Sequence, residues 1–193
     1  MNYLAHIFLS CGDEELLIGN FITDFISAKQ VRTIDGIYRQ GVRLHRKIDT
    51  YTDSHPKFRS GTKRLSVHHH KYSPVVLDIL YDHLLAQNWG MYNGQALQTF
   101  ADETYGTLEK HMSVFKEYDI DYIPKMIKHN FLAAYEDKDR VVKVLERMDK
   151  RTKFPSDFKS AMDHLESDYA TYDDEFNCFL PDMIRVVREV DEF

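Results

Sequence analysis

GIYRQGVRLHRKIDTYTDSHP, residues 36–56, is the stretch from which we predict both the helical fold and the candidate site. We expect a helix over about 34–53, which ends before the proline because the residue preceding a proline disfavours the α region. His45, Asp49 and Asp53 are spaced four residues apart, and each step of four turns only about 40° round a helix axis. The three side chains therefore line one stripe, as is typical of a metal site or an acid–base site. The alternative is a solvated helix face on which arginines pair with these carboxylates.

The preceding segment, about 13–28, reads DEELLIGNFITDFISA and is apolar on most sides. We predict a buried helix there. It carries Asn20 and Asp24 four residues apart, and a buried carboxylate costs free energy unless it is paired or bound to a cation. Asp24 is therefore a candidate metal ligand, and a buried pair between Asp24 and an arginine is the alternative.

A second apolar helix is predicted over about 74–89, PVVLDILYDHLLAQNW, because apolar residues occur all round it. Asp78 and Asp82 share one stripe of this helix, and His83 lies about 100° further round. The two carboxylates would repel each other unless a metal ion or an arginine lies between them, and the neighbouring histidine favours the metal ion. Aspartate and histidine without cysteine ligands point to Mn²⁺ or Mg²⁺ rather than to a structural zinc ion.

The rest of the chain continues the helical pattern with few turns. A short apolar segment opens the chain over 2–10, and a basic segment over 57–72 contains His68–His70, which we expect on the surface. Later helices are expected over about 95–117, from Pro124 to about Tyr135, over about 137–150, from Pro155–Ser156 to Tyr172, and from Leu180–Pro181 onwards. No convincing run of alternating strands occurs. The sequence thus predicts an all-α fold with a single compact domain over 1–193 and its candidate site in 1–90.

Cysteine usage and the amino-terminal segment bear on the compartment. The two cysteines, Cys11 and Cys178, form no CxxC pattern, which favours a reducing environment. The first ten residues lack the basic region of a signal peptide, and their apolar run is too short to span a bilayer. We therefore expect a cytoplasmic protein without a membrane partner. The sequence also contains no glycine-rich phosphate loop, GxSxG or HExxH motif.

Basic side chains are concentrated in one block of an acidic protein whose net charge is −6. Residues 28–72 hold eleven basic and three acidic side chains, a net charge of +8. The remainder holds 14 basic and 28 acidic side chains, a net charge of −14. Such a block indicates an anionic partner on one face, whereas the acidic remainder would repel a nucleic acid. The alternative is a solvated face that acidic neighbours balance in the fold.

Four sequence blocks, taken together and in order, resemble the acyl carrier protein phosphodiesterases. The blocks are MNYLAHIFLS, GNFITDF, GVRLHRKIDTYTDSHP and LDILYDHLLAQNW, which cover roughly residues 1–90, and FLPDM resembles a late segment of the family. The resemblance implies hydrolysis of the phosphodiester that joins 4′-phosphopantetheine to a serine of acyl carrier protein. It also implies an all-helical fold related to the HD-type metal phosphohydrolases and a divalent cation, Mn²⁺ or Mg²⁺. By position, it implies functional roles for His6, Asp24, His45, Asp49, Asp53, Asp78, Asp82 and His83. The adjacent pair Asp82–His83 reverses the His-Asp order of the HD pattern.

We therefore expect a metal-dependent phosphodiesterase that acts on holo-acyl carrier protein. The expected metal ligands are Asp24, His45, Asp78, Asp82 and His83, to which the resemblance adds His6. The expected catalytic residues are Asp24, His45, Arg46, Asp49 and Asp53, and Arg46 or Arg43 would bind phosphate oxygens through a bidentate guanidinium. The residues expected to bind the acidic carrier protein are Arg32, Arg39, Arg43, Lys57, Arg59, Lys63 and Arg64. The alternatives are an HD-like hydrolase of a nucleotide or other small phosphate ester, and a non-catalytic helical binding module.

Overall fold

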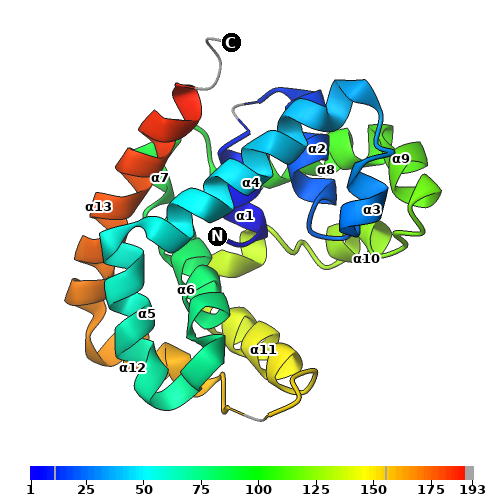
Figure 1. The fold of residues 1–193 in the computed structure, drawn as a ribbon. Coiled ribbons are helices and arrows are strands. Elements are labelled where there is room, and N and C mark those ends of the chain that lie inside the picture. The colour runs from blue at the N-terminus through cyan, green and yellow to red at the C-terminus, as the bar shows by residue number, and fades with distance from the viewer. Residues whose placement is uncertain (11, 155, 190–193) are drawn as a thin grey trace.

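The structure, a computed structural model, describes residues 1–10, 12–154 and 156–189. The α-helices in chain order are α1 (Tyr3–Phe8), α2 (Glu14–Ile22), α3 (Ala28–Val31), α4 (Arg39–Ser54), α5 (Pro56–His69), α6 (Ser73–Gln87), α7 (Trp89–Tyr92), α8 (Leu97–Lys110), α9 (Met112–Glu117), α10 (Ile123–Lys128), α11 (Lys138–Asp149), α12 (Ser160–Ser167) and α13 (Tyr169–Arg188). Short 3₁₀ helices are η1 (Gly36–Tyr38), η2 (His70–Tyr72) and η3 (Ala133–Glu136). No strand occurs within the described ranges, so the predicted all-α class is confirmed (Figure 1).

Helix α6 lies in the middle of the molecule (Figure 1). Eleven of its fifteen residues are buried, as expected for a helix with apolar residues all round. Helices α5 and α13 pack against each other and against α6, while α1, α11 and η3 also contact it. One hydrophobic core therefore joins the amino-terminal, central and carboxy-terminal helices.

Helices α2 and α4 cross at two glycines that allow their backbones to touch. A Cβ atom on Gly41 would lie 2.3 Å from the Leu16 carbonyl oxygen and 2.6 Å from Gly19 Cα. A Cβ atom on Gly19 would lie 2.0 Å from the Tyr38 carbonyl oxygen. No side chain fits at either position without moving the helices apart, which is the use of glycine at a close backbone approach. The crossing places the residues that follow each glycine next to the other helix.

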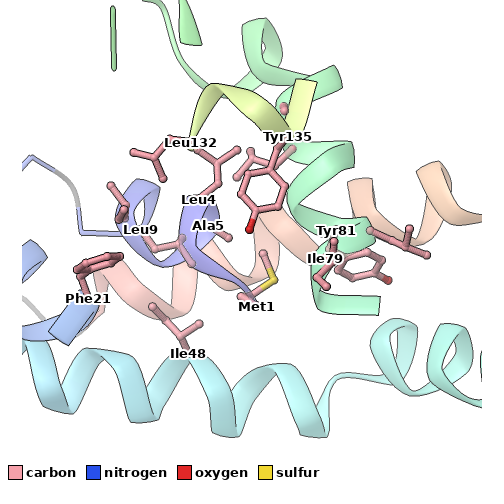
Figure 2. Close-up of a cluster of buried hydrophobic side chains, with 14 of the residues drawn as sticks. Met1, Leu4, Ala5, Leu9, Phe21, Ile48, Ile79, Tyr81, Leu132 and Tyr135 are labelled. Carbon is pink, nitrogen blue, oxygen red and sulfur yellow. The ribbon is translucent and has the colours of Figure 1, made fainter. Parts of the chain in front are cut away.

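Helix α1 has only six residues, too few to be stable in isolation. Its stability comes from burial, since Leu4, Ala5 and Ile7 are at most 1% exposed. Figure 2 shows Leu4 and Ala5 between Ile48 of α4 on one side and Tyr135 of η3 on the other. The apolar opening segment is thus a core element that fixes the position of the polar residues beside it.

The predicted helix over 13–28 is wrong in its second half, because α2 ends at Ile22. The Thr23 hydroxyl donates a hydrogen bond back to the Gly19 carbonyl oxygen at 2.7 Å. Ser27 then starts α3 with a capping box, which requires a break before it. Asp24 therefore lies in a turn at the end of α2 and not inside a buried helix.

Three other segments differ from the prediction. The helix expected over 95–117 divides at His111 into α8 and α9. The segment expected to be helical from Pro124 to Tyr135 contains α10 and then η3. The break expected at Pro181 is wrong, because α13 runs through this proline. Its buried stripe, which includes Phe176 and Met183, packs on α5 and α6 and outweighs the roughly 3 kcal/mol that an interior proline costs.

The basic segment over 57–72 is mostly the regular helix α5, capped by His55. The expectation that the three adjacent histidines lie on the surface is wrong for His69, which is fully buried and donates Nδ1–H to the Ser156 carbonyl oxygen at 3.0 Å. Cys178 is an exposed free thiol, while Cys11 and Pro155 lie outside the described residues. None of the helices in the described part of the chain has the length and hydropathy to cross a membrane.

Candidate metal centre

Three potential metal ligands from two helices meet at the side of α4 that faces α1. His6 of α1 points its Nε2 at Asp49 Oδ1, 3.3 Å away, and His45 of α4 points its Nε2 at Asp49 Oδ2, 3.2 Å away. The two imidazole rings stack with their centroids 4.4 Å apart and an angle of 20° between their planes. The ligand atoms of all three residues lie within 4.8 Å of one another. We call His6, His45 and Asp49 the histidine cluster.

The chemistry of the histidine cluster fits a divalent cation. Imidazole nitrogens and a carboxylate are ligands that Mn²⁺ and related ions accept. Adjacent ligands in a six-coordinate shell of radius about 2.1 Å lie about 3 Å apart, close to the two nitrogen–oxygen distances here. His6 Nε2 is buried and makes no hydrogen bond with any described group. A buried nitrogen left without a partner beside a carboxylate is a position that an ion would occupy.

Asp24 lies at the edge of the histidine cluster, where its Oδ1 is 3.8 Å from His45 Nε2. Its side chain is 31% exposed, so this carboxylate connects the cluster to solvent. Burial raises the pKa of Asp24, and the positive charges of His6 and His45 act against that rise. The predicted proximity of Asp24 and His45 is thus present, although the local structure around Asp24 differs from the prediction.

The charges within the cluster depend on one another. Burial raises the pKa of Asp49, but the hydrogen bond from His45 and the positive charges of His6 and His45 outweigh it, and the pKa falls below its ordinary value. Burial lowers the pKa of His45, but Asp49 and Asp24 outweigh that effect, and the pKa rises. The carboxylates favour a positive charge at this position. In the protein without an ion, a protonated imidazole beside Asp49 supplies that charge.

A second polar cluster contains the carboxylates of α6 and is saturated by the chain itself. Asp82 is fully buried, and its two oxygens accept backbone N–H groups from Leu4 at 2.8 Å and from Asn2 and Ala5 at 3.3 Å. The carboxylate therefore caps the amino terminus of α1, where the helix dipole also favours a negative charge. Burial raises the pKa of Asp82 to about 7, against the opposing effect of the Met1 ammonium group and these N–H groups.

Asp78 completes this second cluster by pairing with the amino terminus. The Met1 ammonium group donates to Asp78 Oδ1 at 2.7 Å. Burial lowers the pKa of this ammonium group, but Asp78 outweighs the effect and the pKa rises. The cation expected beside the Asp78–Asp82 stripe is thus the Met1 ammonium group. We call Met1, Asp78 and Asp82 the cap cluster.

The remaining predicted residues lie outside the histidine cluster. His83 donates Nδ1–H to the Tyr135 carbonyl oxygen at 2.6 Å and is buried in the core. Asp53 is exposed on α4. Arg43 and Arg46 are exposed on the same helix, and neither forms an ion pair within the described part of the chain.

Comparison with known proteins shows which protein family this chain belongs to. The model of the acyl carrier protein phosphodiesterase family matches residues 1–183. The chain belongs to this family. Among relatives named acyl carrier protein phosphodiesterase, the protein of Photorhabdus laumondii is 28% identical over 192 residues, covering 99% of this chain and 97% of the relative. That of Pectobacterium atrosepticum is 27% identical over 189 residues, covering 97% and 98%.

The relative from Escherichia coli O157:H7, also named acyl carrier protein phosphodiesterase, is 28% identical over 192 residues and covers 95% of this chain and 96% of its own length. No solved structure matches this acyl carrier protein phosphodiesterase family member. A structural relation to the HD-type phosphohydrolases therefore stays a prediction. The family match confirms the resemblance seen in the four sequence blocks and extends it into the second half of the chain.

One residue of the site, Asn20, was not among the residues predicted for this family member. It is fully buried in α2, between the two histidines. A polar side chain in an apolar helix, four residues before Asp24, was the signal in the sequence. What the sequence did not show is that the crossing at Gly19 and Gly41 directs Asn20 towards α1 and α4 rather than into the core.

Proposed function

We propose that this protein hydrolyses the phosphodiester that joins 4′-phosphopantetheine to a serine of holo-acyl carrier protein, with Mn²⁺ or Mg²⁺ as the cofactor. The observation that supports the proposal is the histidine cluster, a set of two imidazoles and a carboxylate around one point, in a chain of the acyl carrier protein phosphodiesterase family. The release of apo-acyl carrier protein is the expected outcome of the reaction.

In the proposal, His6, His45 and Asp49 hold the cation, and Asp24 faces it from the solvent side. When bound, such an ion stabilises charge on phosphoryl oxygens and lowers the pKa of a coordinated water. Asp24 is suited to accept a proton from the attacking water, because burial raises its pKa and its side chain reaches solvent. Asp78 and Asp82 are not part of this set, because the amino terminus and the backbone of α1 already occupy their oxygens.

We propose that arginines on α4 bind the phosphate. Arg46 precedes Asp49 by three residues, and the two side chains are about 60° apart round the helix axis. Arg43 lies one turn earlier and is exposed like Arg46. A guanidinium group can bind two phosphate oxygens at once, so Arg46 would orient the diester beside the histidine cluster, whereas Arg43 lies about 120° from Asp49 round the axis.

Basic side chains at the end of α3 and on α4 and α5 are proposed to bind the acidic carrier protein. Six of the seven predicted residues are exposed and form no ion pair among the described residues, namely Arg32, Arg39, Arg43, Lys57, Arg59 and Lys63. Arg64 differs, because it forms two hydrogen bonds with Glu175, at 2.5 Å and 3.2 Å, and lies over the Tyr172 ring. We therefore assign Arg64 a structural role and propose the other six for docking.

The test is to incubate the protein with holo-acyl carrier protein and Mn²⁺ and to measure the intact mass of the carrier. We expect loss of the phosphopantetheine mass with the wild-type protein and none with His45→Ala. An unchanged carrier together with turnover of a nucleotide or a generic diester would instead support the alternative of a small phosphate-ester hydrolase. A protein that neither binds Mn²⁺ nor acts on any diester would support a binding module.

The proposed reaction names one macromolecular partner, and the location of the protein is a separate prediction. Acyl carrier protein is the only macromolecular partner that the proposal requires, and the acidic remainder of the chain still argues against a nucleic acid. A cytoplasmic location stays a prediction that rests on the cysteine pattern and the amino-terminal sequence.

A further inference from the structure

The side chain of Asn20 uses its full hydrogen-bonding capacity inside the protein. Its Oδ1 accepts Nδ1–H from His6 at 2.9 Å and from His45 at 3.2 Å. Its Nδ2 donates to the His6 carbonyl oxygen at 2.7 Å and to Ser10 Oγ at 3.0 Å. Two donors and two acceptor positions are all that a carboxamide offers, and each is used here.

The orientation of this amide follows from its partners. The His6 carbonyl oxygen only accepts, so the NH₂ group of Asn20 must face it. A flipped amide would place Oδ1 against that carbonyl oxygen and the NH₂ group against both ring nitrogens. The oxygen therefore faces both imidazoles, and each imidazole must carry its proton on Nδ1.

A proton on Nδ1 decides what the other nitrogen can do. In a neutral imidazole with Nδ1–H, Nε2 carries the lone pair and is the nitrogen that binds a metal. The Nε2 atoms of His6 and His45 are the two that face Asp49. Metal-binding histidines are commonly held by such a bond from the other ring nitrogen, which fixes both the tautomer and the ring plane.

We propose that Asn20 is a positioning residue for the metal centre, whose single amide oxygen holds His6 and His45 in the Nδ1–H tautomer with both Nε2 lone pairs directed at the ion. This inference rests on the proposed function, because it requires that the histidine cluster binds a divalent cation. One oxygen thereby aligns two ligands that come from different helices.

The packing around Asn20 supports a positioning role. It is fully buried, and a buried amide in an otherwise apolar helix is unfavourable unless all its hydrogen bonds are made. The neighbouring crossing at Gly19 and Gly41 brings α2 close to α4. Asn20 Oδ1 can therefore reach His45, which lies one turn after Gly41 on α4. Ser10 holds the opposite end of the amide, and its own hydroxyl donates to the His6 carbonyl oxygen at 3.0 Å.

The first measurement uses metal-free protein with Asp49→Ala, because the Asp49 carboxylate would otherwise compete for a proton on Nε2 of either ring. It records ¹⁵N signals of the two imidazoles at a pH where both rings are neutral. We expect both rings to carry the proton on Nδ1 when Asn20 is present and a substantial population with the proton on Nε2 when Asn20→Leu is added. Rings with the proton on Nε2 in the protein that keeps Asn20 would overturn the inference even if the Leu variant failed to fold.

The second measurement is Mn²⁺ affinity, followed by electron paramagnetic resonance of the free ion. We expect Asn20→Leu to bind Mn²⁺ about 10- to 100-fold more weakly, the loss typical when a bond that orients a metal ligand is removed. The matched control is Ser10→Ala, which removes a partner of the NH₂ group but not of Oδ1 and should change the affinity by less than about threefold.

The outcomes separate this inference from the proposed function. If the wild-type protein binds Mn²⁺ through His45 but Asn20→Leu binds it equally well, the positioning role is wrong and the metal centre stands. If the wild-type protein binds no Mn²⁺, or if His45→Ala still binds it, the metal centre itself is wrong and the inference fails with it.

Discussion

The histidine cluster and the cap cluster lie at opposite ends of helix α1 and neutralise their carboxylates in different ways. In the cap cluster, the chain supplies every partner, because backbone N–H groups and the Met1 ammonium group bond to Asp82 and Asp78. In the histidine cluster, Asp49 faces two imidazole nitrogens, and His6 Nε2 has no hydrogen bond with a described group.

This difference separates a carboxylate that the chain saturates from one that could hold a cation better than burial does. Asp82 is fully buried, whereas the side chain of Asp49 is 48% exposed. The more deeply buried group is the better satisfied, as expected when burial without partners is costly. Asp49, which faces two imidazole nitrogens, is the carboxylate to test for chemistry.

The largest effect is expected from His45→Ala. Removing one of the three proposed ligands should lower turnover of holo-acyl carrier protein by about 10³-fold or more, because in the proposal the cation supplies most of the charge stabilisation. Stability in chelator should fall as well, since His45 is buried, stacks on His6 and bonds to Asn20, so the rate is compared per folded molecule. The assay is intact mass of the carrier over time, with exposed Thr50→Ala on α4 as control. Comparable rates for both variants would remove His45 from the centre.

Asp82→Ala should lower the stability of the protein while leaving Mn²⁺ binding by the folded molecules largely intact. Three backbone N–H groups lose their acceptor and α1 loses its cap, so we expect a loss of about 3 kcal/mol in the free energy of unfolding. Denaturant titration in chelator measures this loss. Below the unfolding transition, Mn²⁺ affinity per folded molecule should stay within about tenfold of the wild type. An intact melting temperature combined with abolished Mn²⁺ binding would make Asp82 a ligand and contradict the comparison.

Gly41→Ala tests the crossing that brings the histidine cluster together. The added methyl group would meet backbone atoms of α2 at 2.3 Å to 2.6 Å, so the helices must separate. We expect a loss of about 1 to 3 kcal/mol in stability, together with weaker Mn²⁺ binding. Gly106→Ala in α8 is the matched control, because nothing lies within 4 Å of its Cβ position. That change should stabilise the protein by about 0.5 to 1 kcal/mol.

Asp49→Asn tests the electrostatics of the metal-free histidine cluster through pH. The pKa of Asp49 is lowered, so its contribution is present above its unfolded value and is lost as the pH falls. The pKa of His45 is raised, so its contribution is present below its unfolded value and is lost as the pH rises.

The melting temperatures of wild type and Asp49→Asn in chelator should therefore differ most between about pH 4 and pH 6.5, the ordinary pKa values of the two groups. The difference should shrink on either side of this window. Added Mn²⁺ should extend the wild-type advantage to higher pH, because the ion replaces the proton. A difference that does not vary with pH would mean that Asp49 acts through packing alone.

The smallest effect is expected on the docking surface. Reversing Arg39 and Lys57 to glutamate should raise KM for holo-acyl carrier protein several-fold and reduce its salt dependence, with kcat little changed. Kinetics at low and physiological salt are needed because screening weakens surface charges. The control reverses two exposed lysines outside the basic block, Lys143 on α11 and Lys150 at its carboxy-terminal cap, so that the net charge changes equally. Equal effects of both reversals would mean that net charge, not this face, governs binding.

Local sequence patterns were sufficient for the helical class and for part of the site. The four-residue spacing of His45 and Asp49 predicts their meeting, because both lie on one helix. The end of α2 was missed because the Ser27 capping box lies inside an apolar run. The path of α13 through Pro181 was missed because its burial against α5 and α6 is a tertiary effect.

The other residues of the site could not be predicted from local patterns, because their positions depend on contacts between segments far apart in the sequence. His6 was expected only from the family resemblance, since no spacing within α1 relates it to α4. Asp78 and Asp82 were expected to need a cation, and the sequence could not show that the amino terminus and the backbone of α1 would meet that need. Asn20 was visible as a polar residue in an apolar helix, but its direction depends on the crossing at Gly41.

The stability of helix α1 should depend on whether the histidine cluster holds an ion. The helix is too short to persist alone, and it is held at one end by the cap cluster and at the other by His6. In the proposed function, binding of the ion at the histidine cluster and docking of the amino-terminal segment are thermodynamically linked, and by reciprocity each strengthens the other by the same free energy. Amide hydrogen exchange in α1 should slow when the ion binds, which makes the first helix an internal reporter of a loaded enzyme.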